Sequence, residues 1–219
     1  MSTPFSWITF DVRDLLPPSW QQDALAAASG ADFHDFPRTP VLTREAPDVT
    51  FITRGRLHAD QVRQRLPWLA GLYHGPLLNR INQSREEPAV TAEDQRYTVV
   101  LNVQRGRSMR FEAHVDSNPL SGLLFFTGHP QGGGEICFAR DPRVFGLKEI
   151  DRDCTMISPQ PGHLVLFDGR VHPHYARRLN DNSDIRVLAA MNYYTASFPE
   201  SNRPPALNQH LYGDPALSM

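Results

Sequence analysis

The sequence predicts a mainly β protein with flanking α-helices, and two observations carry this prediction. Eight short apolar runs follow one another closely after Arg96, each bounded by Gly, Pro, Asn or Asp. Short strands at such close spacing are typical of a barrel or a sandwich. The 19 prolines among 219 residues indicate many turns and strand ends, which favours a β-rich fold over an all-helical one.

The eight runs define the predicted strands. They are Tyr97–Val103, Met109–His114, Leu120–Thr127, Glu135–Ala139, Thr155–Ser158, His163–Phe167, Val171–Arg177 and Ile185–Tyr194. No linker-like stretch divides the chain, so we expect a single domain over residues 1–219. Its parts would be an α-rich N-terminal support (1–95), a β core (96–195) and an irregular C-terminal arm (196–219).

The predicted N-terminal support contains several short elements. Trp20–Ala28 follows two prolines and is expected to be a helix, and the β-branched run Val49–Thr53 is expected to be a strand. Apolar residues recur near helical spacing over residues 59–81, where Pro67 and Pro76 must interrupt the path. We therefore expect two or three short helical pieces in that region.

Charge and hydropathy restrict the partners. A formal net charge of −2 gives no general attraction to nucleic acid or to an anionic membrane surface. Met1–Asp14 lacks the basic and apolar regions of a signal peptide, and no stretch approaches the roughly 18 apolar residues of a membrane span. We expect a soluble, cytoplasmic protein, and the sequence leaves its oligomeric state open.

Two histidine-containing segments indicate a metal site. His114 and Asp116 are two positions apart, so in an extended chain their side chains face the same point. A second cluster, with His172 and His174, follows where a barrel would return the chain to that point. Two imidazoles and one carboxylate on one face of an octahedral metal are diagnostic of non-haem Fe(II) oxygenases.

The coordination positions left open suggest the chemistry. A 2-oxo acid can take two of them and O₂ the third, and oxidative decarboxylation then yields succinate, CO₂ and an oxidant for a C–H bond. A cation is needed for the distal carboxylate of 2-oxoglutarate. Arg186 opens an otherwise apolar strand, and its guanidinium can bind a carboxylate through two parallel hydrogen bonds.

The order of these motifs resembles the Fe(II)/2-oxoglutarate-dependent dioxygenase superfamily over roughly residues 96–195. The motifs are His114-Val-Asp116, Gly132-Gly-Gly-Glu135, Pro159-Gln-Pro-Gly-His-Leu-Val-Leu-Phe-Asp-Gly169, Pro173-His174 and Arg186. The resemblance implies a double-stranded β-helix, a jelly-roll or cupin-like barrel whose mouth holds Fe(II). Within the superfamily the chain is most similar to small, carrier-independent amino-acid hydroxylases and halogenases. That similarity includes Pro199–Pro205 and Leu207–Gly213.

The resemblance also bears on the distal ligand and on the reaction. It favours His174, which follows a proline as in the family pattern, with His172 as the alternative because both share strand parity. Related halogenases have a small residue where this chain has Asp116, so hydroxylation is the expected outcome. Desaturation or ring closure by the same oxidant, and a protein-modifying, prolyl-hydroxylase-like activity, remain alternatives. A jelly-roll binding protein without an iron site is the non-enzymatic alternative.

The substrate is expected to be a small molecule, either a free amino acid or an amino-acid-derived intermediate of natural-product biosynthesis. Five polar residues near the motifs are candidates for binding it: Asn102, Ser117, Asn118, Asn192 and Tyr194. They could hydrogen-bond a zwitterion, or they could cap turns and satisfy backbone groups. The sequence leaves both roles open.

Overall fold

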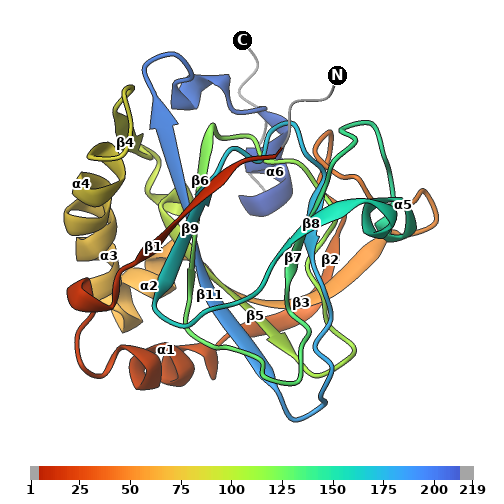
Figure 1. Cartoon of the computed structure of the whole chain (residues 1–219), viewed down its shortest axis with the longest axis horizontal. Helices are drawn as coiled ribbons and strands as arrows, with labels where there is room; N and C mark the ends of the chain where they lie inside the picture. The colour runs from red at the N-terminus through yellow and green to blue at the C-terminus, as the bar shows by residue number, and fades with distance from the viewer. Residues whose placement is uncertain (1–4, 213–219) are drawn as a thin grey trace.

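Two antiparallel sheets surround a common interior (Figure 1). The computed structural model describes residues 5–212. The larger sheet has the order β1 (Trp7–Asp11), β9 (His163–Phe167), β6 (Leu120–Phe125), β11 (Ile185–Thr195), β5 (Val99–Arg105), β3 (Phe51–Leu57) and β2 (Asp32–Pro37), with β4 (Ala89–Thr91) also paired to β11. The smaller sheet has the order β10 (His174–Ala176), β7 (Ile136–Ala139) and β8 (Cys154–Ile157). The prediction of a mainly β barrel with flanking helices is confirmed.

Strand β11 lies at the centre of the larger sheet and separates two cores. Because successive side chains in a strand point to opposite faces, Val187 and Ala189 pack into the core beneath the helices. Leu188 packs into the core between the two sheets. Arg186 and Asn192, which share its parity, line a cavity in the barrel interior. The alternation along this one strand therefore fixes which side chains can reach that cavity.

Four helices cover the outer face of the larger sheet (Figure 1). They are α1 (Trp20–Ala28), α2 (Ala59–Arg65), α3 (Pro67–His74) and α4 (Pro76–Asn82). Pro67 and Pro76 each stand at the start of a helix, where their missing N–H leaves no further group unpaired. The predicted helix over Trp20–Ala28 and the division at both prolines agree with the structure. No helix within residues 5–212 is long and apolar enough to cross a membrane.

The N-terminal region contributes strands to the larger sheet in addition to the expected helices. It supplies β1, β2, β3 and β4 to the same large sheet that residues 99–195 build. A second difference concerns Met109–His114, which forms no regular strand. Only His114 makes β-bridges in that segment, one to Thr43 and one to His174. The described chain also has a helix that the sequence analysis did not predict, α5 (Leu147–Arg152).

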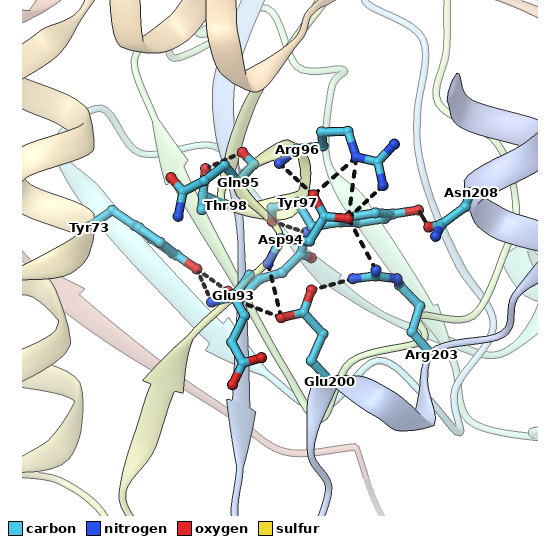
Figure 2. Close-up of polar contacts among 12 residues, drawn as sticks. Tyr73, Glu93, Asp94, Gln95, Arg96, Tyr97, Thr98, Glu200, Arg203 and Asn208 are labelled. Carbon is cyan, nitrogen blue, oxygen red and sulfur yellow. Dashed lines mark hydrogen bonds and ion pairs between the residues drawn. The ribbon is translucent and has the colours of Figure 1, made fainter. Parts of the chain in front are cut away.

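The C-terminal segment is partly helical rather than irregular. It contains the short 3₁₀ helix η3 (Glu200–Asn202) and α6 (Ala206–Tyr212), which lies over one end of the barrel (Figure 1). Figure 2 shows how this segment is held: Arg203 pairs with Glu200 and, at 3.4 Å, with Asp94. The Tyr97 hydroxyl donates to Asn208 at 2.8 Å. Gly213 of the C-terminal motif and the rest of the predicted arm lie outside the described residues, as do residues 1–4.

Candidate metal centre

A cavity lies between the two sheets. Its lining includes His114, Asp116, His174 and Arg186. These four residues come from three separate places in the chain: His114 and Asp116 from the extended segment before β6, His174 from the start of β10, and Arg186 from β11. The fold therefore brings the predicted iron ligands and the predicted 2-oxoglutarate arginine into one cavity.

Backbone pairing places the three candidate metal-ligating side chains side by side. The His114 N–H donates to the His174 carbonyl and the His174 N–H donates to the His114 carbonyl, both at 2.9 Å. The Asp116 N–H donates to the Gly169 carbonyl at 2.9 Å. One ligand atom from each of the three residues lies within 4.8 Å of the others. Asp116 Oδ1 is 3.3 Å from His114 Nε2 and 3.7 Å from His174 Nε2.

In each of the two histidines, one ring nitrogen is hydrogen-bonded to a backbone carbonyl. His114 Nδ1 lies 2.8 Å from the Glu112 carbonyl, and His174 Nδ1 lies 3.0 Å from the His172 carbonyl. A carbonyl can only accept, so Nδ1 carries the proton and the Nε2 lone pair faces the centre. Burial lowers the pKa of His174 to about 4, which keeps its ring neutral near pH 7. A neutral imidazole is the form that binds a metal.

The two carboxylate oxygens of Asp116 have different neighbours. The Ser121 hydroxyl donates to Oδ2 at 2.6 Å and itself accepts from the Asn118 amide at 3.0 Å, so Oδ1 is left towards the histidines. Burial alone would raise the pKa of the Asp116 carboxyl. The neighbouring His174 and His114 rings and the Ser121 hydroxyl outweigh this effect and hold its pKa well below the usual range. The carboxylate is therefore charged and oriented at neutral pH.

Replacing Ser121 with alanine is expected to weaken Fe(II) binding about tenfold, because hydrogen bonds that orient a ligand contribute on the order of 10–100-fold to metal affinity. Anaerobic titration with Fe(II) would measure this. Ser117→Ala is the matched control, since Ser117 has no contact with Asp116 among the hydrogen bonds of the described chain and lies outside the cavity lining. Equal Fe(II) affinity in the two variants would contradict the orienting role.

Gly169 leaves no room for a side chain beside the centre. A Cβ at this position would lie 2.1 Å from Asp116 Oδ2 and 2.9 Å from His174 Cε1. Both distances are far below van der Waals contact, so any other residue would displace the carboxylate or the ring. The close packing of Asp116 and His174 therefore explains why the Phe167-Asp-Gly169 motif has a glycine at this position.

Arg186 is a buried cation with unused hydrogen-bond donors. Its side chain is 1% exposed, and only Nη1 has a partner, the Gln104 side-chain oxygen at 2.8 Å. The Nε and Nη2 atoms have none within the described chain. Burial lowers the pKa of Arg186 to about 9, and the charge of Glu135 opposes this. Two adjacent unpaired N–H groups match the two oxygens of a carboxylate.

The two candidate distal histidines have different surroundings in the structure. His174 joins His114 and Asp116, whereas His172 is absent from that group. His172 lies in a bend before β10, its Nδ1 is 2.9 Å from the Ala139 carbonyl, and its ring packs edge-on against Phe5. Both histidines are buried, as expected from their parity, but only His174 lines the cavity, and His172 packs against Phe5 of the core between the sheets.

Only some of the five candidate substrate residues line the cavity. Asn102 and Asn192 line the cavity. Asn118 is buried and holds Ser121 and the Leu120 carbonyl, so it supports Asp116 rather than facing the cavity. Ser117 is not in the cavity lining, and Tyr194 packs with Tyr97 in a separate cluster near α6. Strand parity with Asn102 would also have indicated Gln104, whereas no sequence signal marked Ser121.

Solved structures support the fold. A comparison with family models gives no match, and no curated protein is similar in sequence. An oxidoreductase of the 2OG-Fe(II) oxygenase family from Burkholderia pseudomallei is 13% identical and has a TM-score of 0.58, over 90% of this chain and 89% of that chain. HygX from Streptomyces hygroscopicus, with nickel, 2-oxoglutarate and hygromycin B bound, is 12% identical with a TM-score of 0.57, over 90% and 86%.

A third structure covers nearly the whole chain. The epimerase SnoN, in complex with Fe³⁺, alpha ketoglutarate and nogalamycin RO, is 11% identical with a TM-score of 0.63, over 98% of this chain and 90% of that chain. Likeness at such low identity concerns the arrangement of the backbone. The chain accordingly has the double-stranded β-helix fold of the 2OG-Fe(II) oxygenase structures, as the sequence resemblance implied.

Proposed function

We propose that this protein is an Fe(II)- and 2-oxoglutarate-dependent oxygenase that hydroxylates an unactivated C–H bond of a small molecule. The observation that carries the proposal is the meeting of a two-histidine, one-carboxylate group with a buried, partly unpaired arginine in one cavity. The substrate class we propose is a free amino acid or an amino-acid-derived intermediate. The hygromycin B bound to HygX and the nogalamycin RO bound to SnoN support a small-molecule substrate, without bearing on its class.

The roles of the residues follow from their positions. His114, Asp116 and His174 would hold Fe(II) through Nε2, Oδ1 and Nε2, which leaves the remaining coordination positions to the co-substrates. When bound, the iron supplies the redox chemistry that couples decarboxylation of 2-oxoglutarate to oxidation of a C–H bond by O₂. Arg186 would bind the distal carboxylate of 2-oxoglutarate through its unpaired N–H groups. Apolar lining residues such as Leu188 and Phe167 would keep water from the reacting centre.

Asp116 favours hydroxylation over halogenation. Its carboxylate occupies the position that a halide would need, and Ser121 holds it there. Desaturation and ring closure use the same oxidant and stay as alternatives, and the SnoN structure is described as an epimerase, so proteins of this fold differ in outcome. Product mass distinguishes these reactions.

The proposed class is tested by succinate formation. Purified protein with 2-oxoglutarate and O₂ is expected to release succinate only when Fe(II) is added, and a chelator should abolish the release. His114→Ala and Asp116→Ala serve as controls for iron free in solution. Absence of Fe(II)-dependent succinate, or equal release by the wild type and both variants, would refute the proposal.

A further inference from the structure

Arg54 is a second buried cation near the centre, and the proposed reaction leaves it without a role. It lies on β3, and its side chain is only 4% exposed. Its guanidinium lies between two phenylalanine rings, 4.5 Å from the centroid of Phe36 and 4.1 Å from that of Phe111. Phe111 lines the cavity, whereas Arg54 is outside the lining and contacts it through this ring, whose centroid is 5.3 Å from that of His114. A single aromatic ring therefore lies between Arg54 and an iron ligand.

No counter-ion accompanies this charge. Among the ion pairs of residues 5–212, none involves Arg54, and its Nε has no hydrogen-bond partner. The nearest acid that affects it is Glu112, whose two oxygens already accept from the Thr39 N–H and hydroxyl at 2.6 and 2.7 Å. A buried, unpaired charge is strongly unfavourable for folding. Such a group is usually retained for a ligand that pairs with it.

The surroundings leave one edge of the guanidinium for a ligand. The two rings cover its flat faces, so only the in-plane N–H groups remain for hydrogen bonds, and these are the groups that bind a carboxylate. Arg56 shares the face of β3 with Arg54 and is paired with Asn102 of β5. Asn102 lines the cavity, and the described chain shows no hydrogen bond from its amide. Arg54 and Asn102 are therefore the donors available on the β3 and β5 side of the cavity.

Acceptors that could satisfy these donors are scarce. The only carboxylate in the cavity lining is that of Asp116, which faces the histidines. Burial, and then repulsion by the charge of Arg56, lowers the pKa of Arg54 to about 9, and the charge of Glu112 opposes this. An anionic ligand would relieve this repulsion as well as the missing hydrogen bonds.

We propose that Arg54, together with Asn102, binds a carboxylate of the primary substrate at the β3 and β5 side of the cavity. This inference rests on the proposed function, since it names the substrate's recognition group. It is separate from the 2-oxoglutarate position, because Arg186 lies on β11 and is held by Gln104. A planar carboxylate with one negative charge suits a guanidinium flanked by two rings better than a bulky, doubly charged phosphate.

The test measures binding as thermal stabilisation. Wild-type protein loaded with Fe(II) and saturating 2-oxoglutarate, kept anaerobic, is titrated with each common L-amino acid and with the corresponding α-carboxamide. We expect at least one amino acid to raise the melting temperature, and its amide to need a concentration at least about 30-fold higher, the loss typical of a buried charge pair that is broken. Saturating 2-oxoglutarate keeps Arg186 occupied, so the response reports the second site.

Two variants assign the effect to Arg54. Arg54→Gln should shift the titration with the free amino acid at least about 30-fold to higher concentration and should respond little to the change from acid to amide. Arg105→Gln is the matched control, because Arg105 also lies over a phenylalanine, Phe33, but is exposed on the neighbouring strand. It should titrate like the wild type. Mass analysis of an aerobic reaction with the stabilising amino acid then identifies the oxidised product.

Several outcomes would overturn the inference. Equal stabilisation by acid and amide, no stabilisation of the wild type by any free amino acid, or an unchanged titration of Arg54→Gln would each contradict a substrate-carboxylate site. The comparison of acid with amide needs only the wild type, so it decides even if Arg54→Gln does not fold. Failure of the proposed function is seen separately, as absence of Fe(II)-dependent succinate from the wild type.

Discussion

Replacing His174 with alanine is expected to reduce Fe(II) affinity by more than about 100-fold and to abolish turnover, because it removes one of the three protein ligands. Loss of a mere supporting contact already lowers metal affinity on the order of 10–100-fold, so a direct ligand should exceed that range. Anaerobic equilibrium dialysis with Fe(II) measures the affinity, and succinate release measures turnover.

His172→Ala is the control for this prediction. Its Nδ1 contact with the Ala139 carbonyl is a structural hydrogen bond, whose loss should lower the free energy of unfolding by about 1 kcal/mol and leave Fe(II) affinity unchanged. The two histidines lie in the same motif and have similar burial, so they differ mainly in orientation. Retained binding in His174→Ala with loss in His172→Ala would reverse the assignment.

Replacing Arg186 with glutamine is expected to weaken 2-oxoglutarate binding by about 30-fold or more, while Fe(II) affinity stays near the wild-type value. The loss arises because the distal carboxylate would enter a buried site without its cation. Isothermal titration of the iron-loaded protein with 2-oxoglutarate measures it. The same titration with 2-oxovalerate, which lacks the distal carboxylate, should give equally weak binding in both proteins.

The comparison of 2-oxoglutarate with 2-oxovalerate distinguishes binding of the distal carboxylate by Arg186 from a packing role. If Arg186 had only a packing role, the variant would lose affinity for both compounds to the same extent. Arg105→Gln, an exposed arginine whose backbone pairs with Ile185 next to Arg186, controls for the loss of a positive charge in this part of the sheet. A wild-type preference for 2-oxoglutarate that survives in Arg186→Gln would exclude the assigned role.

The central strands and the grouping of the candidate metal ligands could be predicted because their physical signals are local. Strands β9 and β11 are buried on both faces and therefore appear as apolar runs, and Arg186 stands out at the start of one of them. His114 and Asp116 share a face through simple alternation. Strands β1 and β2, in contrast, lie at the edges of the larger sheet and are largely exposed, so neither shows the regular alternation of a strand with one buried face.

The remaining features depend on tertiary packing. Whether His172 or His174 faces the cavity is decided by the residue at which β10 begins, and sequence alternation alone does not specify that residue. Arg54 stands in the sequence Thr-Arg-Gly-Arg, which has the composition of an exposed strand end. Its burial arises only after Phe36 and Phe111 close over it from other segments.

The backbone carbonyls that hold the two histidine rings have a consequence for how the proposed metal would be acquired. Both rings already have one tautomer and one orientation before any ion arrives, since Glu112 and His172 belong to the same extended segments as the ligands themselves. Little side-chain entropy then remains to be lost when a metal binds. Metal uptake can therefore follow completion of the fold, and a chelated protein should regain its activity on simple addition of Fe(II), without an unfolding and refolding step.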